Sequence, residues 1–186
     1  MGKRYENILE TIAEICTLVD GPVSAEVTAT DFETMLIEGK KLASIAPNVA
    51  VKVPLTEAGL RTCRALADTG TTVNVTLCFT AGQALLAAKA GASFISPFVG
   101  RLDDIGTDGM GLIEDICTIY ENFDFDTEVL VASVRSTQHV VDAALIGAHV
   151  VTLPPKILLS LYKHPLTNIG LDAFIADWKQ TGQSIL

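Results

Sequence analysis

The sequence is short of basic residues and has no long apolar run. Thirteen Lys and Arg residues stand against 22 Asp and Glu residues, which gives a net charge of −9. This balance argues against a nucleic-acid partner, because binding to a phosphate backbone needs a basic face. It leaves room for a small phosphorylated ligand, which needs only about two or three well-placed cations. No apolar run reaches the roughly 18 residues of a membrane span, so no membrane partner is expected.

The spacing of the cysteines and histidines matches no redox motif and no metal site. The cysteines form no C-x-x-C motif and the histidines lack the spacing of metal ligands: Cys16, Cys63, Cys78, Cys117, His139, His149 and His164. We therefore expect no metal, and buried thiols in a reducing cytoplasm. Lys3 and Arg4 are followed at once by carboxylates, with no uninterrupted apolar stretch, so the N-terminus is interpreted as an amphipathic helix and not a signal peptide.

Apolar residues make up 49% of the chain, enough for one buried core, and residues 1–186 are interpreted as a single domain. Short β-rich runs alternate with longer amphipathic stretches. The expected strands are Pro22–Val27, Val49–Val53, Thr72–Phe79, Ser93–Phe98, Glu128–Ser133 and His149–Leu153. The expected helices are Tyr5–Val19, Phe32–Ala46, Glu57–Asp68, Ala81–Ala90, Met110–Glu121, Thr137–Ile146, Lys156–Tyr162 and Leu171–Gln180.

The helix-to-strand connections and the polar residues in the strands favour a parallel β/α barrel over an open doubly wound sheet. Gly70, Gly91 and Gly147 each end a helix before an apolar strand, where glycine allows a tight left-handed turn. Such alternation requires right-handed crossovers and a mainly parallel sheet. No G-x-G-x-x-G motif follows the first strand. Polar residues inside the strands indicate the interior of a barrel: Glu26, Lys52, Asn74, Thr76, Ser96 and Ser133.

Lys52 is the first candidate for chemistry. It lies in VAVKVP, between valines and before a proline that ends the strand. A lysine placed there loses hydration, which favours the neutral amine. A neutral amine attacks a carbonyl and forms a Schiff base. The alternative is a lysine that extends from a strand edge into solvent.

Two arginines form the second candidate group. Arg101 and Arg135 each follow a strand within a few residues, and Ser133 adds a hydroxyl. Planar guanidinium groups bind phosphate through bidentate hydrogen bonds, so these residues are a candidate phosphate clamp. The alternative is that one or both arginines pair with Asp103 or Asp104. Both aspartates lie in a connection over residues 99–110 that we expect to be a long loop on the ligand side.

The remaining polar strand residues form the third group. Glu26, Asn74, Thr76 and Ser96 come from strands near Lys52. Schiff-base chemistry needs a water held by polar groups for proton transfer, and a carboxylate with a hydroxyl supplies that. The alternative is a buried polar network that satisfies only itself.

Four segments carry most clearly a resemblance to a known family, and the resemblance as a whole extends from about Leu9 to Lys179. They are VKVPLTEAGL, NVTLCFTAGQALLAAKAGASFISPFVGRLDDIG, FDTEVLVASVRS and HPLTNIGLDAFIADW. These segments resemble the small-subunit transaldolase family, which includes the transaldolase-like proteins and the fructose-6-phosphate aldolases. The resemblance implies a class I aldolase on a (β/α)8 barrel, which moves a dihydroxyacetone unit between sugar phosphates such as fructose 6-phosphate and erythrose 4-phosphate without a cofactor.

The resemblance also implies a role for each candidate residue. Lys52 matches the Schiff-base lysine, and Glu26 and Thr76 match the pair that holds the catalytic water. Asn74 and Ser96 match positions that bind substrate hydroxyls. Three residues match the phosphate site: Arg101, Ser133 and Arg135. Phe98 lies where the fructose-6-phosphate aldolases tend to carry tyrosine, and Glu26 where they tend to carry glutamine. Transaldolase is therefore favoured over the alternative of a direct fructose-6-phosphate aldolase.

By the same resemblance, the sequence begins in the helix after the family's second strand. Six strands are then expected in place of eight, without the first-strand aspartate that serves the family as acid and base for carbon–carbon chemistry. An inactive sugar-phosphate-binding protein is therefore a further alternative. Residues 168–186 include a helix that packs on a neighbouring subunit in this family, and Trp178 gives that helix a large apolar anchor, so a homo-oligomer is expected.

Overall fold

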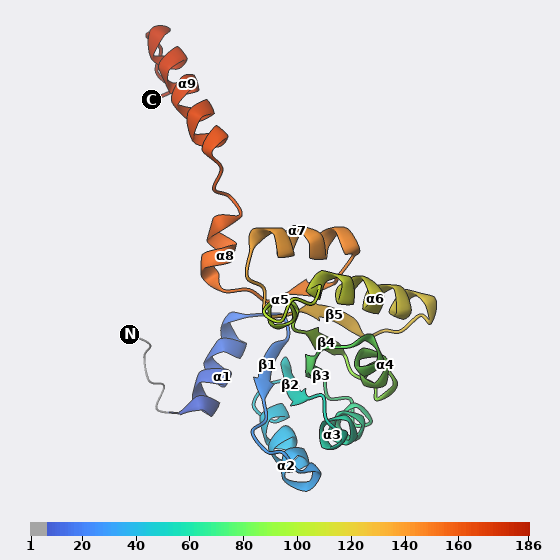
Figure 1. Cartoon of the computed structure of the whole chain (residues 1–186). Coiled ribbons are helices and arrows are strands. Elements are labelled where there is room, and N and C mark those ends of the chain that lie inside the picture. The colour runs from blue at the N-terminus through green and yellow to red at the C-terminus, as the bar shows by residue number, and fades with distance from the viewer. Residues whose placement is uncertain (1–6) are drawn as a thin grey trace.

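In the computed structural model, which describes residues 7–186, strands and helices alternate along the chain (Figure 1). The strands are β1 (Val23–Glu26), β2 (Val49–Pro54), β3 (Val73–Cys78), β4 (Phe94–Pro97), β5 (Glu128–Val131) and β6 (Val150–Val151). The helices are α1 (Ile8–Leu18), α2 (Phe32–Ala43), α3 (Glu57–Ala67), α4 (Ala81–Lys89), α5 (Val99–Asp103), α6 (Gly109–Asn122), α7 (Thr137–Ile146), α8 (Pro155–Ser160) and α9 (Pro165–Gln180).

The strands form one parallel sheet in the order β1-β2-β3-β4-β5-β6. Each strand pairs with the next along the chain, and the crossover helices cover the outer side of the sheet (Figure 1). The sheet curls into an open half-barrel. Within residues 7–186 the expectation of six parallel strands in barrel order is therefore confirmed.

Local sequence explains where the helices begin and end. Asp31, Thr56, Thr80 and Ser136 each accept a hydrogen bond from a backbone N–H in the first turn of the helix that follows. The predicted glycine turns are also present, since the φ angles are 80° at Gly70, 84° at Gly91 and 91° at Gly147. A side chain is strained at such angles, so glycine returns the chain tightly to the sheet.

The two faces of the sheet differ in polarity. Valines on the outer face pack fully buried against the helices: Val51, Val53, Val73, Val75, Val129 and Val131. The alternate residues point to the inner, concave face, because successive side chains of a strand lie on opposite sides. Glu26, Lys52, Asn74 and Thr76 belong to this inner set. The fold thus collects the polar strand residues on one surface.

The structure corrects the predicted elements at three places that bear on the site and on the last helix. The segment expected as a long loop contains the short helix α5, held by backbone hydrogen bonds from Val99 N to Ala132 O and from Gly100 N to Ser133 O. Strand β5 ends at Val131, so Ser133 lies in the following loop with a φ of 61°. Helix α9 begins at Pro165, six residues earlier than expected, because the His164 side chain accepts a hydrogen bond from Leu166 N.

The first predicted helix begins at Ile8, and Lys3, Arg4 and Tyr5 lie outside the described residues. All four cysteines are free thiols. Burial raises the pKa of Cys63 to about 12 and that of Cys78 to about 11, so these two thiols are inert packing residues at neutral pH. Across residues 7–186, every helix is too short or too polar to cross a bilayer.

Candidate functional site

A row of polar side chains crosses the inner face of four neighbouring strands, β1 to β4. In the parallel register Glu26 pairs with Lys52 and Lys52 pairs with Asn74. Thr76 pairs with Ser96 one step further toward the carboxyl ends of the strands. Residues in register on adjacent parallel strands lie about 5 Å apart, which is close enough for their side chains to interact. The sheet therefore brings together five residues that the sequence analysis selected.

Lys52 forms an ion pair with Glu26 at the open side of this row. The Lys52 Nζ lies 3.1 Å from Glu26 Oε2. The lysine side chain is only 23% exposed, whereas the Glu26 side chain is 48% exposed. The Lys52 side chain is thus mostly shielded and its amine is held by Glu26, unlike a lysine that extends freely from a strand edge into solvent. A carboxylate at this distance is placed to exchange a proton with the amine.

Asn74 is the centre of a hydrogen-bonded chain. Its amide nitrogen donates to Ser24 Oγ at 3.1 Å, and its amide oxygen accepts from Ser96 Oγ at 2.8 Å. Asn74 and Ser96 are almost completely buried. Ser24 was not among the predicted residues, although its position two residues before Glu26 places it on the same face of β1. These two hydrogen bonds fix the Asn74 amide beside Lys52.

Thr76 has a hydroxyl that the protein leaves unsatisfied. Its Oγ1 is buried and is the one buried side-chain polar atom of residues 7–186 without a hydrogen-bond partner. Strand β3 is irregular here, because the register shifts between Thr76 and Cys78 and Leu77 has a φ of 60°. Buried polar groups are rarely left unpaired, and strained backbone persists where the surrounding structure enforces it. Both features are typical of a functional position.

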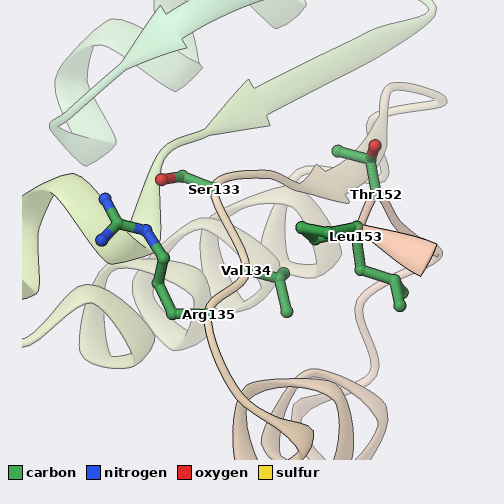
Figure 2. A pocket seen from close by; sticks show the side chains of 6 residues that line it. Ser133, Val134, Arg135, Thr152 and Leu153 are labelled. Carbon is green, nitrogen blue, oxygen red and sulfur yellow. The ribbon is translucent and has the colours of Figure 1, made fainter. Parts of the chain in front are cut away.

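The loop after β5 borders a cavity of about 410 Å³ (Figure 2). The cavity is lined by Ser133, Val134, Arg135, Thr152, Leu153 and Pro154. Figure 2 shows the Ser133 hydroxyl and the Arg135 guanidinium pointing to the same side of the loop. Arg135 also forms a bidentate ion pair with Asp104, as one alternative from the sequence predicted.

The structure does not bring Arg101 to this cavity. Arg101 is an exposed residue of α5, and its guanidinium carbon lies 5.3 Å from the centre of the Phe98 ring. Phe98 in turn makes an edge-to-face contact with Phe79. Of the two predicted phosphate-binding arginines, only Arg135 lines the cavity in this conformation.

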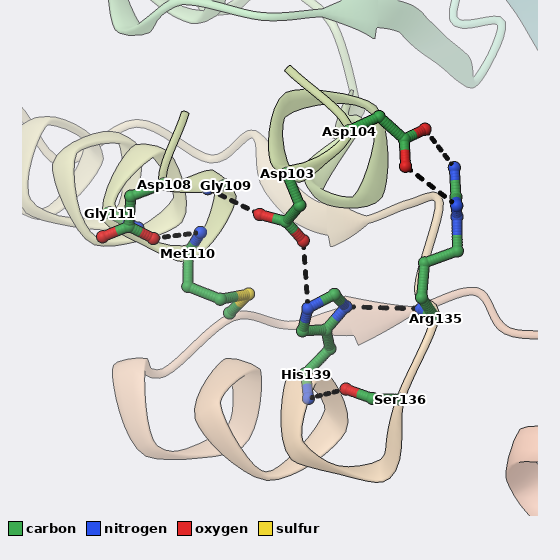
Figure 3. Close-up of polar contacts among 9 residues, drawn as sticks. All are labelled: Asp103, Asp104, Asp108, Gly109, Met110, Gly111, Arg135, Ser136 and His139. Carbon is green, nitrogen blue, oxygen red and sulfur yellow. Dashed lines mark hydrogen bonds and ion pairs between the residues drawn. The ribbon is translucent and has the colours of Figure 1, made fainter. Parts of the chain in front are cut away.

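His139 is a structural residue that the sequence analysis discounted. Its Nε2 lies 3.2 Å from Asp103 Oδ2, and its Nδ1 accepts a hydrogen bond from the backbone N of Arg135 (Figure 3). Asp103 also accepts from Gly109 N at 3.1 Å. These contacts tie α5, α6 and α7 together around the Arg135 loop. Among the described residues, His, Cys, Asp and Glu form no cluster suited to a metal ion.

Comparison with known proteins identifies the family. The family model described as transaldolase/fructose-6-phosphate aldolase matches residues 3–185. The chain belongs to this family. Within the transaldolase/fructose-6-phosphate aldolase family, a probable transaldolase of Chelativorans sp. (strain BNC1) is 65% identical over 96% of this chain and 82% of that protein. A probable transaldolase of Parvibaculum lavamentivorans is 63% identical over all of this chain and 86% of that protein.

A third family member, a probable transaldolase of Ruegeria pomeroyi, is 62% identical over 99% of this chain and 85% of that protein. A similar fold occurs in inosine 5′ monophosphate dehydrogenase from Legionella pneumophila, with a TM-score of 0.59 at 17% identity. That match covers 82% of this chain and 49% of the dehydrogenase chain. At this identity it supports the α/β barrel architecture and nothing about activity.

Proposed function

We propose that this protein is a transaldolase, which transfers a dihydroxyacetone unit between sugar phosphates through a Schiff base on Lys52. The observation that carries the proposal is the Lys52–Glu26 pair, with Nζ and Oε2 3.1 Å apart, beside the Asn74 network on the inner face of the half-barrel. The relatives named probable transaldolase support the same reaction. We further propose that the reaction belongs to the pentose phosphate pathway of the cytoplasm.

The proposed reaction begins at the amine of Lys52. Glu26 first takes a proton from the paired Lys52 ammonium, and the neutral amine attacks the C2 carbonyl of the ketose. A proton moves from the attached nitrogen to the alkoxide, which gives a neutral carbinolamine. Glu26 then gives its proton to the hydroxyl, which departs as water and leaves a protonated Schiff base. Thr76, with its unpaired buried hydroxyl, holds the water that is released and later consumed. Asn74 and Ser96 bind the hydroxyls of the three-carbon unit.

The protonated Schiff base then accepts the electron pair of the C3–C4 bond. Glu26, again a carboxylate after the dehydration, takes the proton of the C4 hydroxyl through the water at Thr76, which releases an aldehyde and leaves an enamine on Lys52. The enamine adds to an acceptor aldehyde, whose oxygen takes the same proton back from Glu26. Water then hydrolyses the new Schiff base to free the product and the amine. The phosphate of each sugar binds at Ser133 and Arg135, with Arg101 moving from Phe98 to join them.

A product assay tests this function against its alternatives. The protein is supplied with fructose 6-phosphate alone and with fructose 6-phosphate plus erythrose 4-phosphate, and products are separated by mass. A transaldolase makes a seven-carbon ketose phosphate only when the acceptor is present. Release of free dihydroxyacetone without an acceptor contradicts this assignment and indicates a fructose-6-phosphate aldolase, the reaction that Phe98 disfavours. Binding of fructose 6-phosphate without either product indicates the inactive binding protein.

We also propose that α9 mediates a homo-oligomer. Figure 1 shows α9 extending away from the rest of the chain. Leu171, Phe174, Ile175 and Trp178 are all exposed and follow the i, i+3, i+4, i+7 spacing of one helix face. An apolar stripe of this kind is stable in water only when another surface covers it. A second copy of the chain is the partner that the family resemblance implies.

Charge placed on the α9 stripe is expected to separate the subunits. Phe174→Glu puts a carboxylate at the centre of the stripe, which disfavours burial. Light scattering after size-exclusion chromatography should then give a smaller mass than for the wild type. Gln180→Glu is the matched control, since it adds a carboxylate to the opposite face of the same helix. An unchanged mass for Phe174→Glu contradicts the role of α9.

A further inference from the structure

We propose that Asp104, which the transaldolase reaction above does not use, positions Arg135 to bind the ligand phosphate. The inference rests on the proposed function, because it concerns the phosphate end of the same substrate. Arg135 Nη1 donates to Asp104 Oδ1 at 3.2 Å and Nη2 donates to Asp104 Oδ2 at 2.8 Å (Figure 3). Asp104 is thus a positioning residue: it contacts the arginine and not the ligand.

The pair leaves Arg135 free to bind a second anion. A guanidinium carries five N–H donors, and the two hydrogen bonds to Asp104 use one on each terminal nitrogen. The N–H of Nε and the other N–H of Nη2 form a second edge of the same planar group. That edge has the geometry for bidentate binding of a phosphate. Asp104 and a phosphate therefore occupy different edges of one guanidinium.

The aliphatic part of the Arg135 side chain packs against helix α5. A Cβ on Gly100 would lie 2.7 Å from both Cγ and Nε of Arg135 and would overlap the carbonyl oxygen of Ser133. The Arg135 stem thus passes directly over Gly100, where no other residue fits. Asp104, the C-cap residue of α5, lies four residues after Gly100, about one turn away, and its own N–H donates to Gly100 O. Gly100 and Asp104 therefore fix the two ends of the Arg135 side chain.

The solvent exposure of the Arg135–Asp104 pair indicates a role in ligand binding and not in stability. The Arg135 side chain is 53% exposed and the Asp104 side chain 56% exposed. Ion pairs with this exposure contribute little to stability because water screens them. Arginine loses much rotamer freedom when a ligand immobilises it. A partner that holds the side chain beforehand removes that cost from ligand binding, so the pair favours affinity over stability.

The inference is tested with Asp104→Asn in the full chain. The affinity for inorganic phosphate is measured by calorimetry, and KM and kcat are measured with fructose 6-phosphate. We expect the phosphate Kd and the KM to rise about fivefold, with a smaller change in kcat, since the variant loses preorganisation at the phosphate end. Asp104→Glu keeps the carboxylate and should restore most of the affinity.

Asp68→Asn is the matched control. Asp68 forms an exposed bidentate pair with Arg64 on α3, away from the cavity, so its loss should leave Kd and KM unchanged. An unchanged phosphate Kd in Asp104→Asn overturns the inference. A lower Kd also overturns it, because Asp104 would then compete with phosphate for Arg135. Phosphate binding needs no turnover, so the inference and the proposed function can fail separately. A wild type that binds phosphate but transfers no carbon unit contradicts the proposed function. The role of Asp104 is then still tested by the phosphate Kd of Asp104→Asn.

Discussion

Lys52→Met is expected to lower kcat for carbon-unit transfer by about four orders of magnitude or more, because it removes the proposed nucleophile. Methionine keeps an unbranched apolar stem in β2 but has no amine to form a Schiff base. Glu26 and Thr76 cannot replace it, since neither carries a nitrogen nucleophile. The measurement is the initial rate of formation of the seven-carbon ketose phosphate.

The loss should not come from unfolding. The Lys52–Glu26 pair is partly exposed, and such pairs contribute at most about 1 kcal/mol to stability. Thermal melts of the variant and the wild type should therefore nearly coincide. Lys40→Met is the control, since Lys40 is exposed on α2 and makes no side-chain hydrogen bond or ion pair with residues 7–186. Retention of more than a tenth of the wild-type rate in Lys52→Met rules out the amine as nucleophile.

Gly59→Ala is expected to have the largest effect on folding. Gly59 lies in the first turn of α3, and a Cβ there would overlap the carbonyl oxygen of Pro54. Pro54 is the last residue of β2, two positions after Lys52. The helix must move away from the strand to relieve this overlap, and we expect the free energy of unfolding to fall by about 3 kcal/mol. Urea unfolding followed by circular dichroism measures the change.

Gly82→Ala is the matched control for this prediction. Gly82 lies in the first turn of α4, behind the threonine cap Thr80, but a Cβ added there would have open space around it, with no atom of another element within 4 Å. Alanine there should leave stability unchanged or raise it by about 0.5–1 kcal/mol, because glycine loses more backbone freedom on folding. Equal stability of the two variants contradicts the tight contact between α3 and the end of β2.

The sequence predicts the strands well because their signals are local. Apolar runs indicate each strand, glycine turns precede three of them, and the parallel sheet then follows from the alternation of strands with helices. The same reasoning places Glu26, Lys52 and Asn74 on one face, as the structure has them. The roles of these residues are predictions from the family resemblance.

The parts that were missed depend on contacts between distant segments. Helix α5 has no side-chain cap at Phe98 and only five residues, and its first turn is held by backbone hydrogen bonds to the loop after β5. The irregularity at Leu77 and the left-handed conformation of Ser133 also have no local glycine to indicate them. The pairing of Arg135 with Asp104 joins segments 31 residues apart. The sequence offered this pair only as one of two alternatives.

The most direct test of Lys52 as the nucleophile is to trap the covalent intermediate. The protein is incubated with fructose 6-phosphate and reduced with borohydride, which converts a Schiff base into a stable amine, and the digested protein is analysed by mass spectrometry. We expect a reduced three-carbon adduct on the peptide that contains Lys52, and none in Lys52→Met. An adduct on a different lysine, or no adduct on a protein that still transfers the unit, contradicts the proposed chemistry.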